Sequence, residues 1–203
     1  MSDEKLYLYP LGIRIWHWTN ALLFLALVIT GISLQYSGPK FALIRFDYAV
    51  RYHNIAGVVL SLSFVFFVLY NRFTVNGKYY KVKRKGFYKR LNKQFQYYMF
   101  GVFKHASSPF PVSEKRKFNP MQKLSYILVM YLMMPVIIIT GFALLFPEVN
   151  LTSFFGISGI YLTDLLHVTT GFVLSVFMFI HIYFCTFGKT IGSNFKSMFN
   201  GWH

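Results

Sequence analysis

Four long apolar runs constrain the fold of this chain more than any other feature. They cover approximately residues 14–36, 51–71, 121–146 and 160–187, and they contain very few charged side chains. A helix needs about 20 apolar residues to cross the hydrocarbon core of a bilayer, and in lipid it satisfies its backbone hydrogen bonds internally. The sequence therefore predicts an all-α membrane protein in which residues 1–203 form one bundle of four transmembrane helices.

The positive charge is concentrated in a single segment between the second and third runs. The net charge is +15, and fourteen of the 21 Lys and Arg residues lie between Arg72 and Lys123. Such charge often indicates a nucleic-acid-binding protein, but a basic loop between transmembrane helices indicates the cytoplasmic side of the membrane. We therefore expect a cytoplasmic loop at 72–120, cytoplasmic N- and C-termini, and lipid rather than nucleic acid as a partner.

Four histidines fall inside or at the ends of the apolar runs. His17 opens the first run and His53 the second, while His167 and His181 lie in the fourth. Fourteen residues are almost four helical turns, so the last two histidines share one helix face about 21 Å apart. The expected topology places His53 and His167 near the outer surface, with His17 and His181 near the inner surface.

Ionisable side chains at membrane depth indicate a functional site. A pair of histidines at each of two depths predicts two bis-histidine haem b groups in the bundle core, with His17, His53, His167 and His181 as iron ligands. The single cysteine, Cys185, and the absence of a C-x-x-C-H motif exclude covalent haem attachment. Residues 21 Å apart cannot share one zinc ion. The alternative is that each histidine forms a hydrogen bond between helices.

Two glycines follow the outer histidines at the same spacing. Gly57 lies four residues after His53, and Gly171 lies four residues after His167. Positions four residues apart share a helix face, so each glycine would let a flat porphyrin approach the backbone. The alternative role is close helix–helix contact, which small residues commonly provide in membranes.

The chain resembles the four-helix dihaem cytochrome b subunits of nickel–iron hydrogenases, of formate dehydrogenases (the gamma subunit) and of thiosulfate reductases. The resemblance covers essentially the whole chain, although the basic loop is longer than the family requires. The matching motifs are Arg14-x-x-His17-Trp18, His53-x-x-x-Gly57, Asn119-Pro-Met-Gln122-Lys123 and His167-x-x-x-Gly171 with His181.

The resemblance implies a multi-pass protein of the bacterial inner membrane. Its outer haem, held by His53 and His167, would exchange electrons with an outer-face redox protein, an iron–sulfur or multihaem cytochrome subunit. Its inner haem, held by His17 and His181, would exchange them with a quinone or menaquinone.

Asn119 and Gln122 would line the quinone pocket, again by resemblance. The alternative is that Asn119 caps the third helix, with Pro120 at the first helical position.

Three arginines are candidates for binding the haem propionates. Arg14 is placed for the inner haem, and Arg51 and Arg45 for the outer haem. The alternative for each is an interfacial arginine whose guanidinium extends to the headgroups.

These features predict an electron-transfer subunit of a respiratory oxidoreductase complex that links the quinone pool to an outer-face partner. Two imidazoles leave the iron no open coordination position, so we expect no catalytic residue in this chain. A membrane anchor without haem and a stand-alone transmembrane haem reductase are the alternatives. A haem spectrum separates the anchor from the other two, and co-purification of an outer-face redox protein separates the leading prediction from the reductase.

Overall fold

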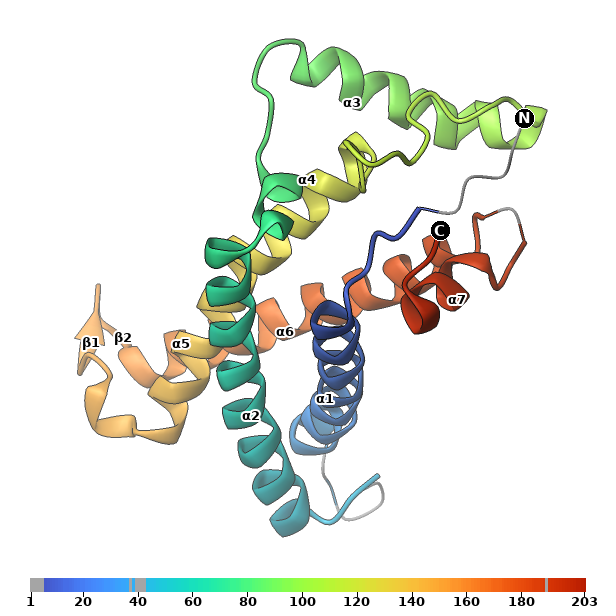
Figure 1. Ribbon diagram of the computed structural model, residues 1–203. Helices are drawn as coiled ribbons and strands as arrows, with labels where there is room; N and C mark the ends of the chain where they lie inside the picture. Colours follow the sequence, from blue (N-terminus) through green and yellow to red (C-terminus); the bar gives the residue numbers. More distant parts are fainter. Residues whose placement is uncertain (1–5, 37, 39–42, 189) are drawn as a thin grey trace.

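Four long helices dominate the computed structural model, which describes residues 6–36, 38, 43–188 and 190–203. Within that part of the chain, four helical stretches are long and apolar enough to cross a membrane. This confirms the predicted helical protein with four candidate spans (Figure 1). The spans are α1 (Leu11–Tyr36), α2 (Phe46–Phe73), the continuous stretch Pro120–Leu145, and α6 (Gly159–Cys185).

The helix boundaries agree with the sequence-based ranges to within a few residues, and the largest difference lies at the start of α2. This helix begins at Phe46 rather than near residue 51. Asp47 occupies its first turn, where a negative charge favours the helix dipole. Arg45 pairs with Asp47 at 3.0 Å, so polar residues that resemble a loop in the sequence belong to the helix and its immediate flank.

The third span contains a widened turn rather than a simple proline kink. It consists of α4 (Pro120–Leu128), the π-helical turn η4 (Val129–Met133) and α5 (Met134–Leu145). Pro135 lies at the start of α5, where it lacks an N–H and its ring would clash with a carbonyl one turn earlier. The π-helical turn removes this conflict, and the helix continues across the membrane.

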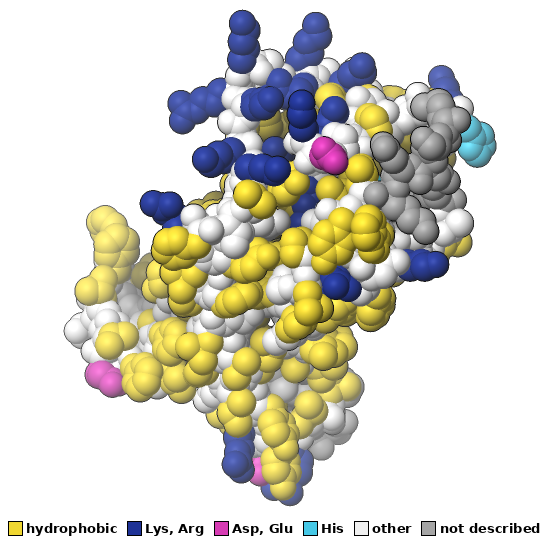
Figure 2. Space-filling view, viewed as in Figure 1, with side chains coloured by type: hydrophobic (Ala, Val, Ile, Leu, Met, Phe, Trp, Pro, Cys, Tyr) yellow, Lys and Arg dark blue, Asp and Glu magenta, His cyan; other side chains and the backbone are white. Residues whose placement is uncertain are grey.

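The basic segment 72–120 is partly helical. It contains η1 (Val75–Tyr80), α3 (Phe87–Gln96), the π-helical turn η2 (Tyr97–Gly101) and η3 (Val102–Lys104). Figure 1 shows α3 lying across one end of the helix bundle. Figure 2 shows Lys and Arg side chains gathered at this end, above a broad hydrophobic surface. A basic amphipathic helix at this position has the properties of a helix at the membrane interface.

The first described residues, from Leu6, meet the C-terminal end of the chain on the same side of the bundle as α3 (Figure 1). Leu6 and His203 exchange backbone hydrogen bonds of 3.0 and 2.9 Å. The C-terminal helix α7 (Ser193–Asn200) packs beside the start of α1, where the Trp18 indole donates to the Met198 carbonyl at 3.1 Å. The C-terminal end of α1, the start of α2 and a small hairpin lie away from this end.

The hairpin pairs β1 (Ser153–Phe154) with β2 (Ile157–Ser158) in antiparallel register. Its turn residues, Phe155 and Gly156, have φ angles of 49° and 77°. Positive φ at both central residues gives the turn a twist that matches the strands, although it is unfavourable for a bulky side chain such as Phe155. The Phe155 side chain is 90% exposed at the tip.

The core of the bundle is small and lies where the four spans meet. Leu60, Val129, Met134 and Leu174 form its buried centre, and each is at most 7% exposed. Many large apolar side chains on the outer faces of the helices remain exposed. A contiguous apolar surface of this size indicates contact with lipid.

Candidate functional site

The bundle brings the four central histidines together as two pairs. The rings of His53 on α2 and His167 on α6 have centres 6.3 Å apart. The rings of His17 on α1 and His181 on α6 have centres 6.2 Å apart. His167 and His181 lie on the same continuous helix, so the two pairs are separated by about 21 Å along its axis.

We call His53 and His167 the outer pair and His17 and His181 the inner pair, after their predicted depths. The tautomers of the outer pair are fixed by two threonines. Thr30 Oγ1 lies 2.9 Å from His53 Nδ1, and Thr140 Oγ1 lies 3.0 Å from His167 Nδ1. Each hydroxyl also donates to a carbonyl one turn earlier in its helix, at 2.7 Å for Thr30 and 2.8 Å for Thr140. A hydroxyl has a single proton, so it must accept from the histidine Nδ1–H. Nε2 of each ring therefore keeps its lone pair.

The two halves of the outer site repeat one sequence pattern. Each half combines an Ile-Thr-Gly motif on one helix with His-x-x-x-Gly-x-Val-Leu-Ser on the next. The residues are Ile29-Thr30-Gly31 with His53, Gly57, Val59, Leu60 and Ser61, and Ile139-Thr140-Gly141 with His167, Gly171, Val173, Leu174 and Ser175. The repeat is visible in the sequence and is the signal that could have identified the two threonines before the structure was known.

Four glycines surround the outer pair in two different ways. A Cβ on Gly31 would lie 3.5 Å from His53 Cε1, and one on Gly141 would lie 3.2 Å from His167 Cε1. These two glycines, which the sequence reasoning missed, make room for the imidazole rings. A Cβ on Gly57 would meet no atom within 4 Å, and one on Gly171 would meet a single side-chain atom at 3.8 Å. Gly57 therefore does not serve a close helix–helix contact.

The inner pair has a less regular environment. Nδ1 of His17 is buried and has no hydrogen-bond partner among the described residues. Nδ1 of His181 lies 3.4 Å from the Tyr126 hydroxyl, and its Nε2 lies 3.8 Å from Cys185 Sγ. A buried polar atom without a partner is costly in a protein interior, so the described side chains around His17 leave this nitrogen unsatisfied.

Both pairs fit the ligation of one metal ion by two imidazoles. Two imidazoles that bind an ion from opposite sides, with metal–nitrogen distances of about 2.0–2.1 Å, have ring centres roughly 6 Å apart. Within the described ranges, no group of three or more His, Cys, Asp or Glu residues could form a metal cage of side chains alone. Two histidines per site leave the remaining coordination positions to a macrocycle, and the backbone at Gly57 is accessible to a flat group. These residues could therefore hold two haems.

Asn119 and Gln122 form a capping box at the start of α4. The Asn119 side chain accepts from the Gln122 backbone N–H at 2.9 Å, and the Gln122 side chain accepts from the Asn119 backbone N–H at 3.1 Å. Asn119 Nδ2 also donates to the Tyr98 hydroxyl at 2.8 Å. Pro120 occupies the first helical turn, so the alternative capping role is present in the structure.

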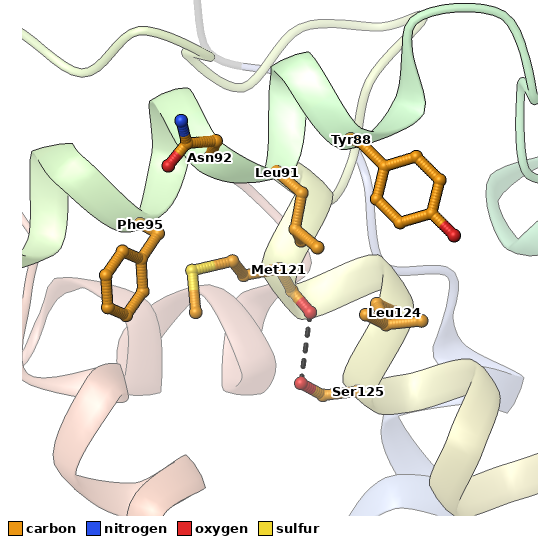
Figure 3. Close-up of a pocket in the computed structure, with 7 residues that line it drawn as sticks. All are labelled: Tyr88, Leu91, Asn92, Phe95, Met121, Leu124 and Ser125. Atoms are coloured by element: carbon orange, nitrogen blue, oxygen red, sulfur yellow. Dashed lines mark hydrogen bonds between the residues drawn. The ribbon is translucent and has the colours of Figure 1, made fainter.

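An apolar groove of about 430 Å³ lies between α3 and α4, next to this capping box (Figure 3). Figure 3 shows side chains from both helices facing one another across it. Its lining residues are Tyr88, Leu91, Asn92 and Phe95 from α3, and Met121, Leu124 and Ser125 from α4. The next residue, Tyr126, contacts His181, so α4 connects the groove with the inner histidine pair.

The three arginines considered as propionate ligands have different surroundings. Arg14 bonds the Phe199 carbonyl through Nη1, while its Nε is buried without a partner among the described residues. Arg51 is exposed on α2. Arg45 is paired with Asp47, and both side chains are largely exposed. Arg14 is therefore the one of the three with a buried, unused donor.

Lys117 is a buried cation that the sequence reasoning missed. It is 4% exposed, and its Nζ lies 3.3 Å from Asn76 Oδ1 and 4.4 Å from the centre of the Tyr9 ring. Burial lowers the pKa of the Lys117 ammonium from 10.5 to about 8, and burial likewise raises the pKa of Tyr9 to about 12.

The lowered pKa of Lys117 predicts a pH-dependent stability. The unfolded chain holds this proton up to about pH 10.5, whereas the folded protein releases it at about pH 8, so this group raises the free energy of unfolding as pH increases between these values. The full rise is about 3 kcal/mol, at 1.36 kcal/mol per pKa unit. Lys117→Met should lose this rise, and chemical unfolding in detergent at about pH 7 and about pH 11 measures nearly all of it. Exposed Lys115 supplies the control, because Lys115→Met should retain the wild-type dependence.

Comparison with known proteins places the whole bundle within one family. The family model described as prokaryotic cytochrome b561 matches residues 8–201. A protein of Escherichia coli (strain K12) described as "Putative cytochrome YdhU" is 36% identical over 200 residues, which are 98% of this chain and 75% of that protein. The family match includes all four long helices and the four paired histidines.

Proposed function

The chain belongs to the prokaryotic cytochrome b561 family of membrane haem proteins, and we propose that it transfers electrons across the membrane through two b haems. The observation that carries this proposal is the presence of two histidine pairs, with ring centres 6.2 and 6.3 Å apart, at the two ends of one bundle. An anchoring or scaffolding role would require neither the pairs nor their separation along α6.

His53 and His167 would hold the outer haem, and His17 and His181 the inner haem. A bound bis-histidine haem supplies reversible one-electron chemistry at an iron without an open coordination position. The protein's contribution is to fix the rings, exclude water and set the electrostatics around them. Gly57 and Gly171 would give the porphyrin access to the backbone, and Arg14 would offer its buried guanidinium nitrogen to an inner propionate.

The groove between α3 and α4 is the site that we assign to a quinone. Its volume falls within the range of small-molecule sites, and its lining is mostly apolar with a few polar groups, as a quinone ring and isoprenoid tail require. Ser125 and Asn92 line the groove, while Asn119 and Gln122 lie at its edge in the capping box. Tyr126 would connect this site with the inner haem through its contact with His181.

The orientation that we propose has both termini and α3 in the cytoplasm. Fourteen of the 21 basic residues lie between Arg72 and Lys123, and the positive-inside rule assigns such a segment to the cytoplasmic side. Figure 2 supports this assignment, because Lys and Arg gather at the end of the bundle that carries α3. The protein would then lie in a bacterial inner membrane with its quinone site facing inward.

The opposite end of the bundle would contact an outer-face redox protein. The β1–β2 hairpin projects there and exposes the apolar side chains of Phe154 and Phe155 (Figure 1). The segment between α5 and α6 contains no Lys or Arg, which suits translocation to the outer side. A separate partner is required in this proposal, because no described segment on this side is large enough to form a second redox domain.

A direct test uses quinol-driven reduction of the haems in purified protein. Under anaerobic conditions a soluble quinol analogue should reduce the haems, seen as growth of their reduced absorption band. His17→Ala should slow this reduction at least about tenfold, or about 1.4 kcal/mol in the barrier, because it removes a ligand of the haem next to the quinone site. A protein that contains haem but is reduced by dithionite and not by quinol would contradict the quinone assignment and favour the stand-alone reductase.

A further inference from the structure

We propose that Thr30 and Thr140 are positioning residues for the outer haem, and that their hydroxyls lower its redox potential by accepting the Nδ1–H of the axial histidines. The inference rests on the proposed ligation by His53 and His167. It adds two residues whose hydroxyls contact the histidines and would act on the haem through them.

Each threonine is constrained to accept rather than donate. Both side chains are buried, with exposures of 3% for Thr30 and 6% for Thr140. The carbonyls of Ala26 and Val136 lie 2.7 and 2.8 Å from the two hydroxyl oxygens, and a carbonyl can only accept. The single hydroxyl proton therefore points along the helix, and the oxygen's lone pair faces the histidine.

This arrangement has a defined electronic consequence. An imidazole that donates its Nδ1–H to an oxygen becomes a stronger base at Nε2, and outer-shell partners of this kind orient the ring and tune the metal. A more basic ligand stabilises ferric iron, with its higher charge, more than ferrous iron. Both threonines should therefore lower the potential of the outer haem.

The inner pair provides an internal contrast. His17 Nδ1 has no partner among the described residues, and His181 Nδ1 has only a long 3.4 Å approach to the Tyr126 hydroxyl. The effect should therefore be confined to one haem.

The test compares Thr30→Val and Thr140→Val in spectroelectrochemical titrations of the purified holoprotein. Valine keeps the volume of threonine and removes the hydroxyl. Losing an outer-shell partner typically changes metal binding about tenfold or more. Because the hydrogen bond favours ferric over ferrous iron, we assign this tenfold change to the ratio between the two oxidation states, which corresponds to about 59 mV for one electron. Each variant should raise the outer haem's potential by about this amount, leave the inner haem unchanged, and shift the low-spin ferric spectrum of one haem only.

Two serines offer a matched control. Ser61 and Ser175 donate to the carbonyls of Gly57 and Gly171 at 2.8 Å, and no hydrogen bond joins either serine to a histidine. Ser61→Ala and Ser175→Ala should leave both potentials at the wild-type values. Thr30→Ser should retain the wild-type potential because it keeps the hydroxyl. Loss of the outer haem from a valine variant, with rescue by serine, would also support a positioning role for the hydroxyl.

The inference fails if the valine variants keep both haems at wild-type potentials, or if the serine-to-alanine controls move the outer potential equally. Failure of the underlying ligation gives a different result. In that case His53→Ala would leave the haem content and every potential unchanged, and the threonine variants could not be interpreted through a ligand.

Discussion

His53→Ala and His167→Ala should each reduce the haem content from about two to about one per chain and remove the same haem, the outer one. The two imidazoles have ring centres 6.3 Å apart, so a haem held by both would lose one of its two protein ligands in an apolar site. His17→Ala and His181→Ala should remove the other haem by the same argument, since their rings are 6.2 Å apart. Pyridine haemochrome quantitation and redox titration of the four variants measure both the loss and its pairing.

Exposed His105, in the basic segment, is the control for this series. His105→Ala should retain both haems and both potentials. The pairing would be contradicted if the two single variants of one pair left haems with different potentials, or if the double variant His53→Ala/His167→Ala lost more haem than either single variant.

Filling the groove between α3 and α4 should abolish quinol-driven reduction while leaving the haems in place. Leu124 lines the groove and faces α3, so Leu124→Trp would occupy much of the space of about 430 Å³. We expect reduction by a quinol analogue to slow at least about tenfold, which corresponds to about 1.4 kcal/mol in the barrier. Haem content and reduction by dithionite should stay at wild-type levels, because the histidine pairs lie outside the groove.

Leu128, one turn further along α4, provides the matched control. It is 45% exposed and does not line the groove, so Leu128→Trp should react with quinol at the wild-type rate. Equal rates for Leu124→Trp and the wild type would contradict the assignment of the quinone to this groove. The quinone would then bind at another site near the inner histidines. A parallel loss of haem in Leu124→Trp would instead indicate a folding defect.

The spacing of the histidines predicts much of the geometry of the site, because a helix that crosses the membrane can adopt few arrangements. Apolar runs of fixed length set the spans, and the alternating direction of successive helices sets the depth of each residue. These two constraints are enough to pair His53 with His167 and His17 with His181 before any packing is known. The structure brings together those pairs, and the family match covers all four spans.

Contacts between helices are harder to predict from a single sequence. Thr30 reaches His53 only because α1 and α2 pack at a particular rotation, and apolar runs do not specify that rotation. The repeated Ile-Thr-Gly motif was nevertheless a usable signal, since two copies precede two equivalent histidine motifs. Lys117 gave no such signal, because a lysine in a basic segment resembles its solvated neighbours until the fold buries it.

The basic segment illustrates a different limit. Its charge predicts contact with the membrane interface, but a count of charges does not reveal that α3 packs beside α4 and forms a groove. The amphipathic pattern of Phe87–Gln96 was compatible with a helix lying on the headgroups, so the side of α3 that faces protein was not evident. The quinone site proposed here depends on that contact and on no motif within α3.

The measurement that tests the central claim most directly is the haem stoichiometry of the purified wild-type chain, obtained by pyridine haemochrome together with a reduced-minus-oxidised spectrum. The two histidine pairs predict about two b haems per chain, both low-spin and without an open coordination position. A value of about one haem would contradict transfer between two haems across the membrane. Well-folded protein without haem would contradict the electron-transfer function and favour the alternative of a membrane anchor.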